Sequence, residues 1–160
     1  MSDHYDPRTR TLRLSPDVYD GRSVSSIAVA AHEAGHAIQH VRDYPFLTMR
    51  SNMVPLTMLG SNMWIIVFLI GLFMNFKIFM LAGIVLLALT VLFQIVTLPV
   101  EFDASKRAKE VLASSGIVST QEEAEGVSSV LNAAALTYVA GALTAVTTLI
   151  YYIMVMNRRD

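Results

Sequence analysis

Residues 51–100 read SNMVPLTMLGSNMWIIVFLIGLFMNFKIFMLAGIVLLALTVLFQIVTLPV, and Lys77 is the only charged residue among them. A helix needs about 20 apolar residues to cross the hydrocarbon core of a bilayer. This stretch supplies two such runs, at 54–74 and 78–98, which are joined by only three residues. The sequence therefore predicts two membrane-spanning helices that form a tight hairpin.

A third apolar run, at 133–156, lies inside a segment without charges that extends from 126 to 157. Of the 160 residues, 54% are hydrophobic, which is more than an ordinary small soluble domain contains. A buried core helix is the alternative explanation for each run, but three such runs in one short chain disfavour it. We predict a mainly α membrane protein, a single domain over 1–160, with about three transmembrane helices.

The segments outside these runs are charged and carry their own structural motifs. In residues 1–53, Asp6-Pro7 and the alternation at 11–15 predict a short β-hairpin, and Ser23 is a plausible N-cap for a helix over about 24–42. Residues 99–130 are expected to form a soluble helical segment. Ser119 and Glu122 match a capping box that starts the helix leading into the third run.

Composition excludes several classes of site. The net charge of −1 gives no electrostatic case for nucleic acid as a partner. The absence of cysteine rules out disulfides and thiolate ligands, so a transition-metal site must use His, Asp and Glu. The chain has four histidines, which are His4, His32, His36 and His40.

The motif HEAGH, residues 32–36, falls inside the predicted helix 24–42. His32 and His36 are four residues apart, so they share one helix face and can bind one Zn²⁺. Glu33 is turned by about 100° and is better placed to accept a proton from a metal-bound water, as a catalytic general base. The alternative is a polar face of an amphipathic helix. The apolar residues at 27–31 disfavour it, because buried imidazoles beside a buried carboxylate are costly without a metal or other partners.

A catalytic zinc needs a third protein ligand, and Glu101 is the strongest candidate. It is the first charge after the 78–100 run, and two spans separate it from His36, which puts both on the same side of the membrane. Asp103 is the rival, turned by about 200° from Glu101 on a helix. Solvation of a carboxylate at the membrane surface is the non-functional explanation of Glu101.

Two other histidines stay open as alternatives. His40 continues the face of His32, but it lies about 12 Å further along a straight helix, too far for both to reach one ion near 2 Å. His4 is better placed near a substrate groove.

Four separated stretches, DHYDPRTRTLRLSP, AAHEAGHAIQH, LPVEFDASKRA and LNAAALTYVAGALT, together resemble the YugP-type bacterial membrane zinc metallopeptidases. The resemblance implies a small zincin-like catalytic portion, zinc as cofactor, a third ligand Glu that corresponds to Glu101, and a bacterial cell (inner) membrane. The site is more distantly similar to HtpX-type peptidases, in which the ligand Glu is followed four positions later by Asp. Ser105 occupies that position here, which leaves the residue that supports His32 unassigned.

The function predicted from these features is a zinc-dependent membrane endopeptidase that hydrolyses peptide bonds of unfolded or membrane-associated proteins. Its partners would be a protein or peptide substrate and the lipid bilayer, and a homo-oligomer is compatible with a chain of this size. The alternatives are an intramembrane-cleaving protease and a non-catalytic membrane scaffold with a vestigial metal site.

Three finer expectations concern orientation and substrate. Nine Lys and Arg residues lie on the predicted side of the site against three on the other, which predicts a cytoplasmic active site. The strand at 11–15 could pair with an extended substrate. Candidates for stabilising the oxyanion are Tyr5, His4, Tyr138 and Asn132.

Overall fold

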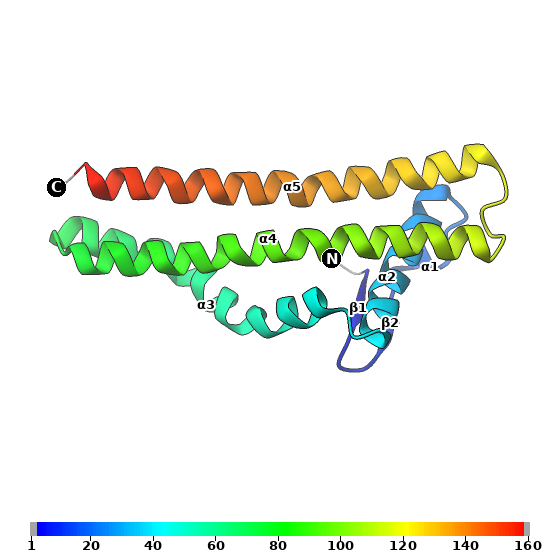
Figure 1. Cartoon of the computed structure of the whole chain (residues 1–160), viewed down its shortest axis with the longest axis horizontal. Coiled ribbons are helices and arrows are strands. Elements are labelled where there is room, and N and C mark those ends of the chain that lie inside the picture. The colour runs from blue at the N-terminus through cyan, green and yellow to red at the C-terminus, as the bar shows by residue number, and fades with distance from the viewer. Residues whose placement is uncertain (1–2, 159–160) are drawn as a thin grey trace. The chain divides into compact units, whose positions relative to one another are not determined.

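The computed structural model describes residues 3–158, and almost all of them belong to helices (Figure 1). A mainly α fold with one small antiparallel sheet confirms the predicted fold class. The elements, in chain order, are β1 (His4–Asp6), β2 (Thr11–Arg13), α1 (Pro16–Tyr19), α2 (Val24–Val41), α3 (Pro45–Met74), α4 (Lys77–Ser114) and α5 (Gln121–Asn157).

Three of these helices, α3, α4 and α5, are long and apolar enough to cross a membrane. Each is longer than its predicted span, since α3 begins at Pro45 and α4 continues without a break to Ser114. At 1.5 Å per residue, the 38 residues of α4 extend for about 57 Å, well beyond a hydrocarbon core of about 30 Å. One helix therefore carries both an apolar span and the segment that begins at Glu101.

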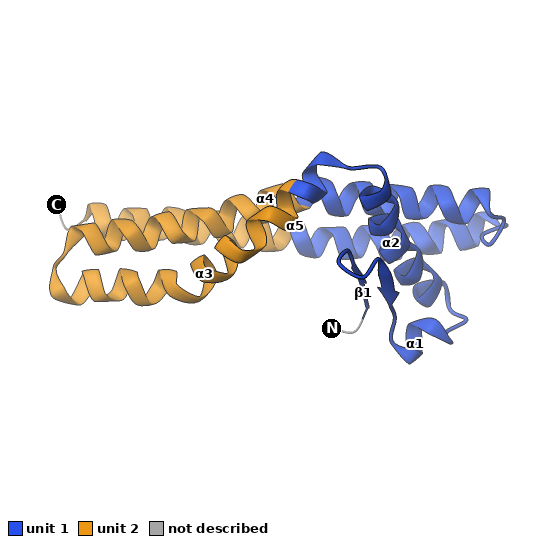
Figure 2. Cartoon of the chain, turned by 90° about the horizontal axis from the view of Figure 1, so that it is seen from below, with its two compact units in different colours: residues 1–48, 98–138 blue, residues 49–97, 139–160 orange. Residues whose placement is uncertain are grey.

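The chain divides into two compact units, coloured separately in Figure 2. Unit 2 comprises Met49–Thr97 and Val139–Asp160. Its first two helices are joined through Asn75, whose φ of 58° allows the chain to reverse within two residues. Phe68 and Met80 are buried against each other across this hairpin. Many other large apolar side chains are exposed, as Phe73 is, and this is the surface that lipid covers in a membrane protein.

Unit 1 comprises Met1–Thr48 and Leu98–Tyr138, and it contains the sheet, α1, α2 and parts of α4 and α5. The strands pair antiparallel with Tyr5 opposite Leu12. Small and branched apolar side chains of three helices form the core, namely Ala28 and Ala31 of α2, Ala108 and Leu112 of α4, and Val127 and Leu131 of α5. The alanines let the three helices approach one another closely.

Helix termini in unit 1 follow the capping motifs in the sequence, with one shift. The Ser23 side chain accepts a hydrogen bond from the Ser26 amide at 3.1 Å, as expected for the N-cap of α2. The capping box of α5 uses Thr120 and Glu123 rather than Ser119 and Glu122. The Glu123 amide donates to Thr120 Oγ1 at 3.2 Å, and the Thr120 amide donates to Glu123 Oε2 at 3.1 Å.

Helices α2 and α4 touch at Gly35. A Cβ atom at this position would collide with the backbone carbonyl of Ala104, which cannot move independently of its helix. Gly35 is itself buried. The glycine of the HEAGH motif therefore sets how closely the two helices approach.

We expect Gly35→Ala to destabilise the protein by about 1–3 kcal/mol, because the added methyl group forces the two backbones apart. Thermal or denaturant unfolding of the purified protein in detergent measures the change. Gly141→Ala is the matched control, since none of the described residues comes within 4 Å of a Cβ there. Alanine favours a helix by about 1 kcal/mol over glycine, so this control should be neutral or stabilising. Equal effects of the two substitutions would contradict the packing role of Gly35.

Candidate metal centre

Two histidines of α2 face one carboxylate of α4 inside unit 1. His32 Nε2 lies 3.1 Å from Glu101 Oε2, and His36 Nε2 lies 3.6 Å from the same oxygen. One ligand atom of each residue lies within 4.8 Å of the other two, and among the residues described these three form the group that could hold a metal ion. The structure thus brings together the three residues that the sequence singled out.

The donor set fits a zinc ion. Two imidazole nitrogens and one carboxylate oxygen, each about 2.0–2.1 Å from a tetrahedral ion, are separated from one another by about 3.3 Å. The observed separations of 3.1 and 3.6 Å from Glu101 lie on either side of this value. Glu101 is only 2% exposed, and a carboxylate buried to this extent needs a cation or hydrogen-bond donors.

The second nitrogen of His32 contacts the residue one turn after Glu101. His32 Nδ1 lies 3.1 Å from the Ser105 hydroxyl. Ser105 therefore supports His32 at the position where HtpX-type peptidases have Asp, and this role was not assigned from the sequence. Helical spacing explains the geometry, because Glu101 and Ser105 are four residues apart on one face of α4.

The second nitrogen of His36 contacts Gln39, which was not among the site residues predicted from the sequence. The distance between His36 Nδ1 and Gln39 Oε1 is 3.0 Å, and Gln39 is fully buried. The spacing could have indicated Gln39, since an amide three residues after a candidate ligand lies on the same helix face.

Glu33 lies outside the group of possible ligands and contacts the sheet instead. Its Oε2 accepts a hydrogen bond from the backbone amide of Tyr5 in β1 at 3.0 Å. This amide points away from β2, so the free edge of β1 faces α2. The contact fixes one carboxylate oxygen of Glu33 beside the two histidines.

The rival ligand candidates have other partners. His40 Nδ1 lies 2.8 Å from the Tyr5 hydroxyl. Asp103 accepts hydrogen bonds from Gln39 and Arg107. Neither His40 nor Asp103 belongs to the group that could hold a metal, and neither does His4.

Neighbouring carboxylates shift the pKa of His36. Burial by itself would lower the pKa of His36, but the hydrogen bond and the charge of Glu101 outweigh burial and raise the pKa above its ordinary value. Hydrogen bonding to Gln39 and the charge of Glu33 act in the same direction. Without a metal, the buried carboxylate therefore favours a protonated imidazole beside it.

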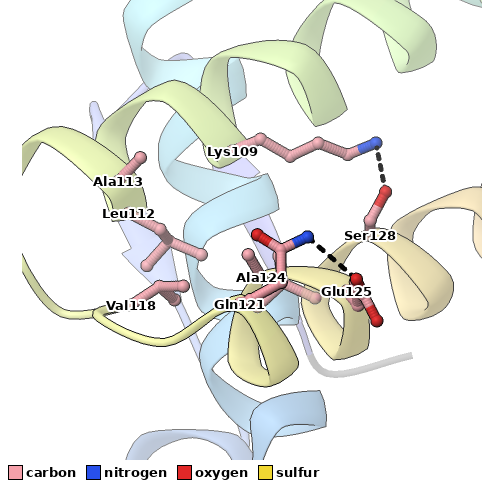
Figure 3. A pocket seen from close by; sticks show the side chains of 9 residues that line it. Lys109, Leu112, Ala113, Val118, Gln121, Ala124, Glu125 and Ser128 are labelled. Atoms are coloured by element: carbon pink, nitrogen blue, oxygen red, sulfur yellow. Dashed lines mark hydrogen bonds between the residues drawn. The ribbon is translucent and has the colours of Figure 1, made fainter.

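A cavity of about 360 Å³ lies elsewhere in unit 1, where α4 ends and α5 begins. Figure 3 shows Lys109 and Ser128 on one side of it, joined by a hydrogen bond of 3.1 Å, and Leu112 and Val118 on the other. None of the three possible metal ligands lines it. The cavity is thus separate from the candidate metal centre.

Comparison with known proteins identifies the family. The family described as "Putative neutral zinc metallopeptidase" matches residues 1–157. The chain is 45% identical over 161 residues to the "Putative membrane protease YugP" of Bacillus subtilis (strain 168), covering 100% of this chain and 71% of that relative. No solved structure matches the chain. The chain therefore belongs to the neutral zinc metallopeptidase family, as a membrane protein related to YugP.

Proposed function

We propose that this chain is a zinc-dependent membrane endopeptidase that hydrolyses peptide bonds of unfolded or membrane-associated proteins. The observation that carries the proposal is the meeting of His32 and His36 with the buried carboxylate of Glu101, while Glu33 stays free of the ligand group. Family membership agrees with this chemistry. His32, His36 and Glu101 would hold the zinc ion, which would supply the Lewis acidity that acidifies water and polarises a peptide carbonyl.

Glu33 is the proposed catalytic general base. It would accept a proton from the attacking water and then deliver it to the nitrogen of the leaving amine. The Tyr5 amide supports this role, because it holds one oxygen of the carboxylate and thereby limits the rotation of the side chain. The burial of Glu101 and His36 keeps bulk water from competing for their charges.

Substrate binding along a strand edge remains part of the proposal, with β2 as the edge that an extended peptide would pair with. This strand lies within residues 11–15, the segment predicted from the sequence to pair with a substrate. The amide of Tyr5 in β1 is hydrogen-bonded to Glu33 and is not available to a peptide, whereas the residues of β2 are exposed. Tyr5 also presents its hydroxyl to His40, and it stays a candidate for oxyanion stabilisation with His4, Tyr138 and Asn132.

We further propose a bacterial cell (inner) membrane with the active site on the cytoplasmic side. The excess of Lys and Arg in the segments that form unit 1 supports this orientation. Arg159, which counts for the opposite side, lies outside the described residues. Cleavage inside the bilayer is the alternative. Helix α2 does not belong to the three helices long and apolar enough to cross, which favours a site at the membrane surface.

Glu33→Gln should retain zinc and lose activity by about 10²–10⁴-fold, because the amide cannot accept the proton. Metal analysis of the purified protein and cleavage of an unfolded protein substrate in detergent or proteoliposomes measure both properties. Wild-type protein that binds zinc but cleaves no faster than the variant would reject the peptidase and leave a scaffold with a vestigial site. Cuts found only within transmembrane segments would favour the intramembrane protease.

His32→Ala and Glu101→Ala should each lower the zinc content well below one ion per chain, since two protein ligands hold zinc far more weakly than three. His40→Ala is the matched control and should keep the wild-type content, because His40 lies outside the ligand group. Unchanged zinc in the first two variants, or loss in the control, would show that the ligand set is different.

Protons should compete with zinc for His36. Because the pKa of His36 is raised, its proton persists to a higher pH than in an ordinary histidine, and apparent zinc affinity should fall as pH decreases through that range. NMR titration of zinc-free protein labelled at histidine measures the pKa directly. We expect a value above the ordinary value of about 6.5, and a lower one in Glu101→Gln. An unchanged pKa in that variant would show that Glu101 is not the cause.

A further inference from the structure

A chain of polar contacts runs from His36 into α4. Gln39 Oε1 faces His36 Nδ1, while Gln39 Nε2 donates to the backbone carbonyl of Val100 at 2.7 Å and to Asp103 Oδ2 at 2.8 Å. Arg107 Nε donates to the same oxygen of Asp103. One buried amide thus connects a proposed ligand of α2 with two charged residues of α4.

The orientation of the Gln39 amide is determined by its partners. Val100 offers a carbonyl, which can only accept, and Asp103 next to Arg107 offers a carboxylate, which also accepts. An amide turned by 180° would direct its oxygen at these two acceptors and leave the buried carbonyl without a donor. The amide nitrogen must therefore face α4, and the amide oxygen must face His36.

An acceptor at this place selects one tautomer of His36. Gln39 Oε1 can only accept, so His36 Nδ1 carries the hydrogen and the lone pair of neutral His36 lies on Nε2, which faces Glu101. Ser105 differs, because a hydroxyl can rotate to donate or to accept and suits either tautomer of His32. Gln39 thus selects the tautomer of His36, whereas Ser105 does not select that of His32.

The far end of the chain of contacts is also anchored. The guanidinium of Arg107 lies 5.8 Å from the centre of the Tyr44 ring, a cation–π distance. The Tyr44 hydroxyl donates to the carbonyl of Pro99 at 3.4 Å. Asp103 therefore cannot turn towards solvent without breaking its contacts with both Arg107 and Gln39.

We propose that Gln39 is a positioning residue that fixes the tautomer and orientation of His36, and that Asp103 and Arg107 hold Gln39 in place. The proposal rests on the proposed metal site. It implies that loss of Gln39 weakens metal binding more than loss of Ser105, although both contact a ligand histidine. It also implies that the identity of residue 103 decides which side chain is tolerated at residue 39.

The test compares zinc affinity, by competition with a chelator, in full-length wild-type protein and its variants. We expect Gln39→Met to lower the affinity by about 10–100-fold and Ser105→Ala by less. Gln121→Met is the control, since Gln121 is exposed and its side chain contacts Glu125. It should keep the wild-type affinity. Equal affinities of wild type and Gln39→Met would overturn the proposal.

A pair of substitutions at residues 39 and 103 distinguishes a positioning role of Gln39 from a packing role. Gln39→Glu keeps the acceptor for His36 but places a second carboxylate against Asp103, so zinc affinity should fall. Gln39→Glu/Asp103→Asn restores a donor between residues 39 and 103, while the Val100 carbonyl still lacks its donor. A partial recovery of zinc affinity over the single variant is therefore expected. The comparison of these two variants also tests the proposal if Gln39→Met does not fold. Absence of recovery overturns the proposal.

A readout without zinc distinguishes failure of this inference from failure of the proposed function. Glu101→Gln removes the carboxylate that competes for the hydrogen at His36 Nε2. In this zinc-free variant, ¹⁵N NMR of neutral His36 should show hydrogen on Nδ1, and Glu101→Gln/Gln39→Met should show a mixture of tautomers. A single, unchanged tautomer in the double variant overturns the positioning role, whatever the metal content. If Glu101→Gln shows this tautomer and wild type binds no zinc, the metallopeptidase is refuted and the role of Gln39 is left intact.

Discussion

The contact between Gly35 and the backbone of Ala104 is the constraint on which the rest of the site depends. A carboxylate side chain is short, so Glu101 can meet two imidazoles of another helix only where the two backbones nearly touch. A Cβ atom at residue 35 would lie less than 3.0 Å from the carbonyl oxygen of Ala104. Relieving this collision would separate the two helices by on the order of 1 Å, which exceeds the tolerance of metal–ligand distances. The small residue inside HEAGH therefore determines whether its histidines find their partner.

Much of this arrangement could be predicted from the sequence because its causes are local. Helical periodicity places His32 and His36 on one face, and runs without charge identify the three long helices. Two features limited the prediction: some motifs could be placed at more than one position, and some contacts join residues far apart in the sequence. Ser119 and Thr120 each have a glutamate three residues later, so the pattern alone could not choose between two capping boxes.

The supporting contacts could not be predicted in the same way. Ser105 meets His32 across 73 positions and Gln39 meets Val100 across 61. The periodicity of each segment does not predict which residues meet, because the contacts depend on how each helix is rotated about its own axis. The orientation of Glu33 towards β1 depends likewise on how the hairpin packs against α2. These contacts turn a motif that many helices could carry into one defined geometry.

The complete use of the Gln39 amide has an evolutionary consequence. Its oxygen and both of its hydrogens are engaged, so no polar atom is left to compensate for a change in a neighbour. A substitution at residue 39 or 103 alone can leave two acceptors or two donors facing each other, whereas a paired substitution can restore the match between these two residues. Among relatives of this chain, these two positions are therefore expected to change together, as a covarying pair separated by 64 residues.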